Sequence, residues 1–101
     1  METLKFSLTT TATISSLYWA PLQAADQGRY VEFADDEGTL VGELKEVAAP
    51  GDYAYILVLR AGQPDSKWDL AIERPGMKPL KRTGTIAGNG EGGRVAELSL
   101  V

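Results

Sequence analysis

The sequence predicts an all-β fold, a small antiparallel β-sandwich of about seven strands in which residues 1–101 form one domain. Three observations predict it. Several short segments alternate between apolar and polar residues with a period of two, which is typical of strands with one buried face. Clusters of Gly, Pro, Asp and Asn separate these segments. A chain of 101 residues with 44% hydrophobic residues can fill one core. A small β-barrel is the alternative architecture.

The first predicted strand runs from Leu4 to Ile14 and shows the longest alternation in the chain. Leu4, Phe6 and Leu8 stand at even positions, and Lys, Ser and Thr fill the odd ones. Threonine suits this arrangement because β-branched side chains favour a pleated, half-exposed surface. We therefore expect one long strand with a buried face and a wet face.

The first 25 residues also have some features of a secretory signal peptide. Lys5 lies near the start, an apolar stretch follows from Phe6 to Leu22, and small Ala24 and Ala25 offer a cleavage site. Glu2 opposes a basic start, and several Thr and Ser residues dilute the apolar stretch. A cytoplasmic protein is therefore favoured, with a secreted one as the alternative.

An apolar cluster, a turn and a second strand follow. The cluster Leu17–Leu22 contains Pro21, which biases the residue before it away from the helical conformation. We predict a packed loop or a short edge strand for this cluster. Asp26–Gly28 supplies a turn, and Arg29–Phe33 is predicted as the second strand.

The periodicity of Thr39–Val47 is ambiguous. Leu40, Leu44 and Val47 follow a helical spacing, which would make the fold α+β. Residues 40–45 also alternate as a strand with a kink at Gly42. The acidic turn Ala34–Gly38, which precedes this segment, favours the strand. A turn of this composition between two β-prone segments is typical of a hairpin.

A central strand and a one-sided strand are expected next. Tyr53–Leu59 is apolar on both faces, which predicts a central position in a sheet. After a surface loop at Ala61–Lys67, Trp68, Leu70 and Ile72 occupy alternate positions. This pattern predicts a strand with one buried face and a buried Trp68.

Two further strands complete the predicted sandwich. Lys81–Ile86 forms one of them. Val95–Val101 forms the other, and it buries either the set Ala96, Leu98 and Leu100 or the opposite set. The glycine-rich segment Ala87–Gly93 is predicted to be a flexible hairpin connection, because it lacks the Lys followed by Ser or Thr of a phosphate-binding loop.

One short motif resembles a known class of protein. Pro50, Gly51, Asp52 and Tyr53 lead into an apolar strand, and the tripeptide at residues 68–70, Trp-Asp-Leu, follows. This arrangement is similar to the proline-glycine-x-tyrosine start of many bacterial β-sandwich modules appended to larger secreted proteins. The resemblance covers about a quarter of the chain, and it implies an architecture without implying an activity.

The composition excludes several classes of function. The chain has neither histidine nor cysteine, which excludes a serine triad, a disulfide scaffold and most transition-metal sites. A net charge of -4 argues against nucleic-acid binding, because it repels phosphates. No apolar run approaches the about 20 residues of a membrane-spanning helix, which argues against membrane insertion. We therefore expect a soluble protein without a cofactor and without enzymatic activity.

Asp35, Asp36 and Glu37 are weak candidates for a metal site. Clustered carboxylates can bind calcium, which prefers six to eight oxygen ligands. The spacing lacks the pattern of an EF-hand, so a solvated hairpin turn is favoured. Asp65 and Asp69 could in principle form the carboxylate pair of a glycosidase, but a chain of this size can scarcely build the necessary cleft.

Tyr18, Trp19 and the loop residue Asn89 are the predicted ligand-binding residues. Tyrosine and tryptophan combine an apolar ring with a polar tip, and they anchor many protein partners. Tyr18 and Trp19 lie in irregular sequence beside Pro21, where at least one side chain must point outward. The leading prediction is a non-enzymatic module that binds a protein partner through these residues and the glycine-rich loop.

Two alternative functions remain open. The first is carbohydrate binding, in which Tyr53 and Tyr55, or Tyr18 and Trp19, would stack on sugar rings. The second is self-association through sheet edges, for which the long first strand and the apolar residues within 98–101 are candidates.

Overall fold

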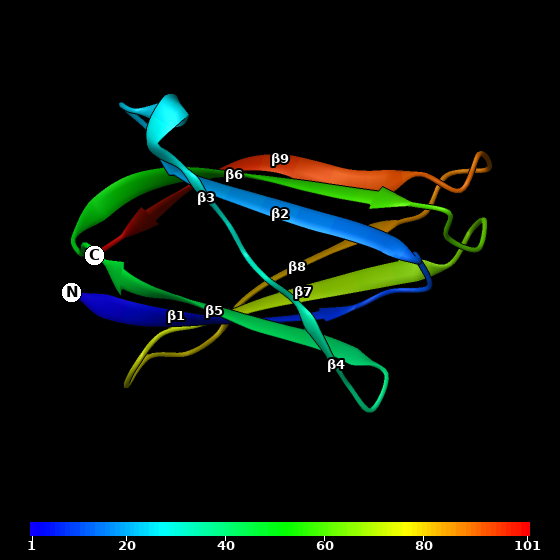
Figure 1. Cartoon of the computed structure of the whole chain (residues 1–101), viewed down its shortest axis with the longest axis horizontal. Helices are drawn as coiled ribbons and strands as arrows, with labels where there is room; N and C mark the ends of the chain where they lie inside the picture. Colours follow the sequence, from blue (N-terminus) through cyan, green and yellow to red (C-terminus); the bar gives the residue numbers. More distant parts are fainter.

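Two antiparallel β-sheets pack face to face in the computed structural model, which describes residues 1–101 (Figure 1). One sheet has five strands in the order β4-β5-β1-β7-β8, and the other has four in the order β3-β2-β6-β9. The strands are β1 (Glu2–Thr9), β2 (Ile14–Pro21), β3 (Arg29–Tyr30), β4 (Ala34–Asp36), β5 (Thr39–Val47), β6 (Gly51–Arg60), β7 (Lys67–Glu73), β8 (Leu80–Thr85) and β9 (Gly92–Leu100). The predicted all-β sandwich is confirmed, and it has nine strands because β2 and β4 add to the seven strands expected.

The single long strand predicted for residues 4–14 is wrong, because the chain turns after β1. The hydroxyl of Thr10 accepts a hydrogen bond from the N–H of Ala12 at 3.1 Å, and that of Thr11 accepts one from the N–H of Gln63 at 2.9 Å. Threonine hydroxyls that bind backbone groups in this way compete with strand pairing. β2 then starts in the other sheet, and β1 lies between β5 and β7 with no free edge.

Of the two predictions for Leu17–Leu22, the loop is wrong and the strand is confirmed, but it is not an edge strand. The cluster forms most of β2, which pairs with β6 along its whole length and with β3 near its end. Pro21 is tolerated because it is the last residue of this strand. A short 3-10 turn, Ala25–Gln27, follows; no helix in the structure has the length and apolar character needed to cross a membrane. Of the strand predicted for Arg29–Phe33, only Arg29 and Tyr30 form β3, which pairs with β2.

The segment after β3 crosses from the four-stranded sheet to the five-stranded sheet (Figure 1). The N–H of Val31 still donates to the carbonyl of Leu17 at 2.9 Å, and the chain then reaches β4. It passes so close to Gly42 in β5 that a side-chain Cβ there would lie 2.6 Å from the carbonyl oxygen of Glu32. The crossing therefore covers one side of the sandwich and needs a glycine beneath it.

Residues 39–47 form β5, so the helical alternative is wrong and the strand is confirmed. A hairpin precedes β5 as expected, but its first strand is β4, which takes up residues predicted as part of the turn, and Asp36 pairs with Thr39. The pairing of β5 with β1 slips by one residue, since Leu4 opposes Leu44 but Glu2 opposes Val47. This bulge lets Leu44 and Val47 both face the core despite their odd spacing, and it explains the apparent helical period.

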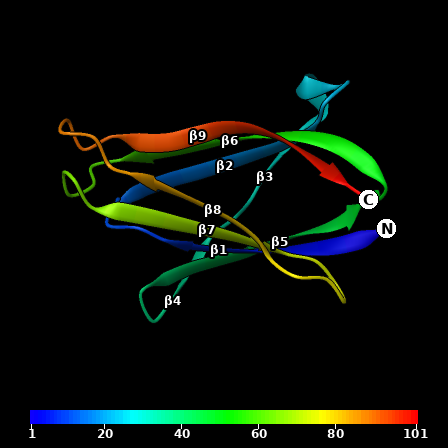
Figure 2. The same cartoon turned by 180° about the vertical axis from the view of Figure 1, so that it is seen from behind.

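β8 and β9 belong to different sheets, so the predicted hairpin at Ala87–Gly93 is wrong. β8 pairs with β7, and β9 pairs with β6 (Figure 2). β6 lies between β2 and β9, as its apolar faces predicted. The inward set of β9 is the one that contains Ala96, Leu98 and Leu100.

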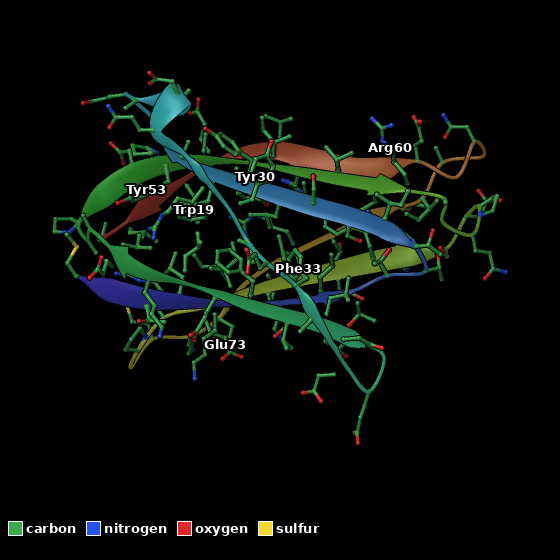
Figure 3. All side chains as sticks on the ribbon, viewed as in Figure 1. Trp19, Tyr30, Phe33, Tyr53, Arg60 and Glu73 are labelled. Carbon is green, nitrogen blue, oxygen red and sulfur yellow. The ribbon has the colours of Figure 1, made fainter.

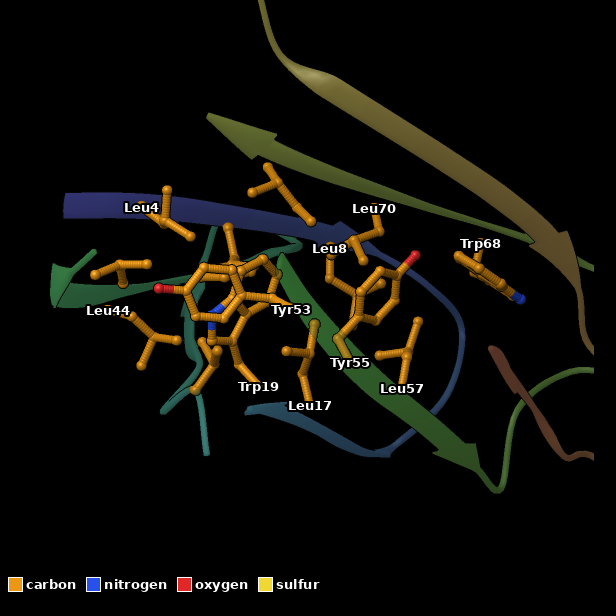
Figure 4. Packing of buried hydrophobic residues seen from close by; sticks show 14 of the residues in the cluster. Leu4, Leu8, Leu17, Trp19, Leu44, Tyr53, Tyr55, Leu57, Trp68 and Leu70 are labelled. Atoms are coloured by element: carbon orange, nitrogen blue, oxygen red, sulfur yellow. The ribbon is translucent and has the colours of Figure 1, made fainter. Parts of the chain in front are cut away.

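Seventeen buried residues, most of them from the strands of the two sheets, form the core, and Figure 4 shows part of this cluster. Trp19 packs edge-on against Phe6, with 5.7 Å between the ring centroids, and stacks on Tyr53 at 5.2 Å. Trp68 is buried as predicted, and its indole ring lies against Gly84 of β8, where a Cβ would clash with it. The glycine thus provides the space that the largest side chain of β7 requires.

Arg74 is the one charged residue buried in the fold. Its guanidinium donates hydrogen bonds to both carboxylate oxygens of Glu2, at 2.9 and 2.8 Å, and to the backbone oxygen of Val101 at 2.9 Å. These bonds lower the pKa of Glu2 and raise the pKa of Arg74, because they favour the charged form of each. Arg74 therefore joins β1 to the end of the chain, and Figure 1 shows the two termini side by side.

Candidate functional site

A row of apolar side chains crosses the outer face of the four-stranded sheet. The strand register places Tyr30 beside Tyr18, Tyr18 beside Ile56, and Ile56 beside Val95. Residues paired across antiparallel strands share a face of the sheet, so these four side chains lie on the face that points away from the core. We call Tyr30, Tyr18, Ile56 and Val95 the apolar row.

Most of the apolar row is open to solvent. Tyr30 is 65% exposed, Ile56 41% and Val95 75%, whereas Tyr18 is half-buried. Ile14 lies four residues before Tyr18 in β2 and therefore on the same face, and it is another apolar side chain, 58% exposed. Water-exposed apolar residues that adjoin one another across a whole sheet are unusual in a protein that has no partner.

Tyr18 is held in a fixed position. Its hydroxyl donates to the carbonyl of Ala25 at 2.6 Å and accepts from the N–H of Gly28 at 2.9 Å. Its ring lies against Gly28, where any side chain would clash with it, and its centroid is 5.0 Å from that of Tyr30. The turn after β2 therefore fixes this ring before any ligand binds.

The outer face of the five-stranded sheet has the opposite character. Lys5, Thr9, Glu43, Asp69 and Glu73 point outward from its strands (Figure 3 labels Glu73). The five-stranded sheet thus has an apolar inner face and a polar outer face, as expected for an antiparallel sheet with one side in water. The apolar row is therefore a property of one face of the molecule.

Asn89 lies in the loop between β8 and β9 and lines a hollow together with two members of the apolar row. A shallow hollow of about 520 Å³ is lined by Ile56 and Val95 together with Asn89, Gly93 and Arg94. The loop around Asn89 is held by its own bonds: Asn89 accepts from the N–H of Glu91 at 3.1 Å, and Gly90 donates to the carbonyl of Ala87 at 2.9 Å. The structure thus connects Asn89 with Ile56 and Val95 through this hollow, whereas Tyr18 does not line it.

Trp19, the third predicted residue, is not on the surface, and its prediction as a contact residue is wrong. It is 2% exposed and lies between the sheets with Tyr53 (Figure 3). Consecutive residues of a strand point to opposite faces, so the outward position of Tyr18 turns Trp19 into the core. Tyr53 and Tyr55 are buried as well, which removes them as a platform for sugar rings.

The acidic turn is remote from the apolar row and belongs to the other sheet. Asp35 accepts a hydrogen bond from the N–H of Gly38 at 3.1 Å, as aspartate does in an ordinary turn. Asp35, Asp36 and Glu37 are all exposed. No group of three or more His, Cys, Asp or Glu side chains is arranged to hold a metal ion.

Tyr30, Ile56 and Val95 are surface residues that the sequence analysis did not identify. The signal for Ile56 was present, because Tyr53–Leu59 is apolar on both faces while only one face can meet the core. Tyr30 and Val95 become significant only through the pairing that places them in line with it. Comparisons of the chain with protein-family models, with curated proteins and with solved structures find no match.

Proposed function

We propose that the protein is a non-enzymatic interaction module that binds a protein partner through the apolar row and the adjoining hollow at Asn89. The observation that carries the proposal is the alignment of Tyr30, Tyr18, Ile56 and Val95 across all four strands of one sheet. Tyrosine is enriched among the residues that dominate binding energy at protein interfaces. Because Tyr18 is already fixed by two hydrogen bonds, its ordering costs little on binding.

The geometry supports a protein partner better than a carbohydrate. The rings of Tyr18 and Tyr30 are tilted by 58°, so they do not form a flat platform for a sugar ring. The other two members of the row, Ile56 and Val95, are aliphatic and suit an apolar protein surface. The hollow beside them contains Glu91 and Arg94 as its charged residues, which offers no carboxylate pair for hydrolysis.

The experiment compares proteins captured by the wild-type chain with those captured by two variants. Tyr30→Asp places a charge in the apolar row, and Thr83→Asp places the same charge on the outer face of the five-stranded sheet as a matched control. We expect the binding of a partner, purified and measured by calorimetry, to weaken at least tenfold in Tyr30→Asp and to stay unchanged in Thr83→Asp. Equal binding by all three chains would refute the proposed site. A thermal shift with oligosaccharides that Tyr30→Asp abolishes would assign the face to carbohydrate instead.

A further inference from the structure

The four sheet edges of the molecule differ in length and protection. β3 has two residues and β4 three, and the crossing segment joins them on one side of the sandwich. β8 has six residues and carries Lys81 and Arg82, the kind of charged residues that discourage pairing between molecules. β9 has nine residues, contains no proline and has two charged side chains, Arg94 and Glu97. It is the longest open edge.

The hydrogen-bond pattern identifies which backbone groups of β9 are free. The N–H of Leu22 donates to the carbonyl of Asp52 at 3.0 Å, so the even-numbered residues of β6 turn their backbone groups toward β2. The odd-numbered residues of β6 therefore pair with the even-numbered residues of β9. Val95, Glu97 and Ser99 consequently turn their N–H and C=O groups toward the open edge.

Nothing in the fold covers this part of the edge. β8 approaches β9 near the loop that joins them and diverges from it toward the C terminus (Figure 2). Glu97 and Ser99 are exposed, as is Val95. A row of unpaired backbone groups of this length matches another extended strand.

We propose that β9 pairs antiparallel with β9 of a second copy, around a twofold axis at Val95. In this register Val95 opposes its own counterpart, Glu97 opposes Gly93, and Arg94 opposes Ala96. No like charges face each other, whereas registers centred on Arg94 or on Glu97 would place like charges opposite each other. A register centred on Ala96 would place Val95 opposite Glu97, and one centred on Gly93 would place it opposite Glu91. The register centred on Val95 instead pairs the exposed apolar side chain with itself.

The second copy fits this edge better than an unrelated strand because the edge is self-complementary. The two four-stranded sheets would become one continuous sheet, and the apolar rows of both copies would meet at Val95. Such an isologous contact closes on itself as a dimer and does not propagate. The inference concerns the edge of the sheet and holds whether or not the outer face binds a protein partner.

Sedimentation of the purified full chain from micromolar to millimolar concentration tests the proposal. We expect a reversible dimer for the wild type and a monomer for Val95→Pro, because proline removes an N–H that the pairing needs and that β6 does not use. The matched control is Thr83→Pro in β8. The N–H of Ile86 donates to the carbonyl of Ser66, so the even-numbered residues of β8 turn their backbone groups toward β7. The N–H of Thr83 therefore points to the open edge of β8, as that of Val95 does in β9. This control should still dimerise.

A wild-type chain that remains monomeric at millimolar concentration would overturn the proposal. So would a dimer that Val95→Pro, still folded by circular dichroism, leaves intact. Single-cysteine variants provide a second measurement if the proline variant fails to fold, because the chain has no cysteine of its own. Paired Cα atoms about 5.5 Å apart are within reach of a disulfide. Val95→Cys should therefore form an oxidised dimer much faster than Ser99→Cys or Thr83→Cys, and equal rates would reject the register.

Discussion

At the scale of single residues, Tyr53 and Tyr55 show how the same side chain meets two environments on one face of one strand. The hydroxyl of Tyr53 donates to the carbonyl of Ala48 at 2.7 Å. The hydroxyl of Tyr55 is fully buried and has no hydrogen-bond partner. Burial raises the pKa of Tyr55, because the charged phenolate is costly where water is absent. The core thus contains one satisfied phenol and one unsatisfied phenol.

Replacing these two tyrosines by phenylalanine should change stability in opposite directions. Tyr55→Phe removes a buried polar group that makes no bond, and we expect the free energy of unfolding to rise by up to about 1 kcal/mol. Tyr53→Phe removes a hydrogen bond and should lower it by about 1 kcal/mol. Urea denaturation of both variants measures the difference. A loss of stability in Tyr55→Phe equal to that in Tyr53→Phe would show that the hydroxyl of Tyr55 has a partner in solution.

At the scale of elements, the bulge in β5 decides how that strand faces the core. Glu46 has a φ of 59°, in the left-handed region that disfavours residues other than glycine. The side chain of Arg29 donates to the carbonyl of the neighbouring Lys45 at 2.6 Å, which supports the bulge from β3. The extra residue shifts Val47 back to the inner face, where it is 1% exposed. The strain at Glu46 therefore accompanies the burial of the end of β5.

Glycine at two positions of β5 should have opposite effects. Glu46→Gly relieves the unfavourable φ, and we expect it to raise the free energy of unfolding by about 1 kcal/mol. Glu43→Gly, in the regular part of the same strand, should lower it by about 0.5–1 kcal/mol, because glycine gains more freedom on unfolding. Both values follow from urea denaturation curves. Equal losses in the two variants would mean that the bulge is not retained in solution.

At the scale of the whole molecule, the two faces and the two ends of the sandwich have distinct roles. The outer face of the five-stranded sheet is polar, while that of the four-stranded sheet carries the apolar row that ends at the open edge of β9. At the end where the termini lie, Arg74 binds both Glu2 and the backbone oxygen of Val101. This contact connects segments that are far apart in sequence, so it belongs to the fold as a whole.

The pH dependence of stability should report on this contact. The hydrogen bonds from Arg74 lower the pKa of Glu2 below its ordinary value of 4.5, so the carboxylate stabilises the fold fully above that pH. The contribution is lost as the pH falls through the lowered pKa. Glu2→Gln should therefore lower the thermal midpoint at neutral pH, and the difference from the wild type should shrink in acid. Glu73→Gln, which removes a carboxylate outside both ion pairs, is the control and should follow the wild type.

Much of the fold could be predicted from the sequence because alternation and turn residues are local signals. They identified the strands at residues 39–47, 53–59 and 68–73, and they placed Trp68 in the core. The same local signals were wrong where a side chain had two uses. The threonines that suit a strand also form the turn at residues 10–13, and the spacing of Leu44 and Val47 arises from a bulge rather than a helix.

Alternation, turn residues and composition were enough to predict an all-β protein and to exclude chemistry based on histidine or cysteine. The tertiary structure was needed where both faces of a strand are apolar or where the alternation is short. The orientation of Trp19 and the line from Tyr30 to Val95 depend on pairings between strands separated by many residues. A shift of one residue in register would exchange the buried and exposed sets, and the partner strand that fixes each register lies far away in the sequence.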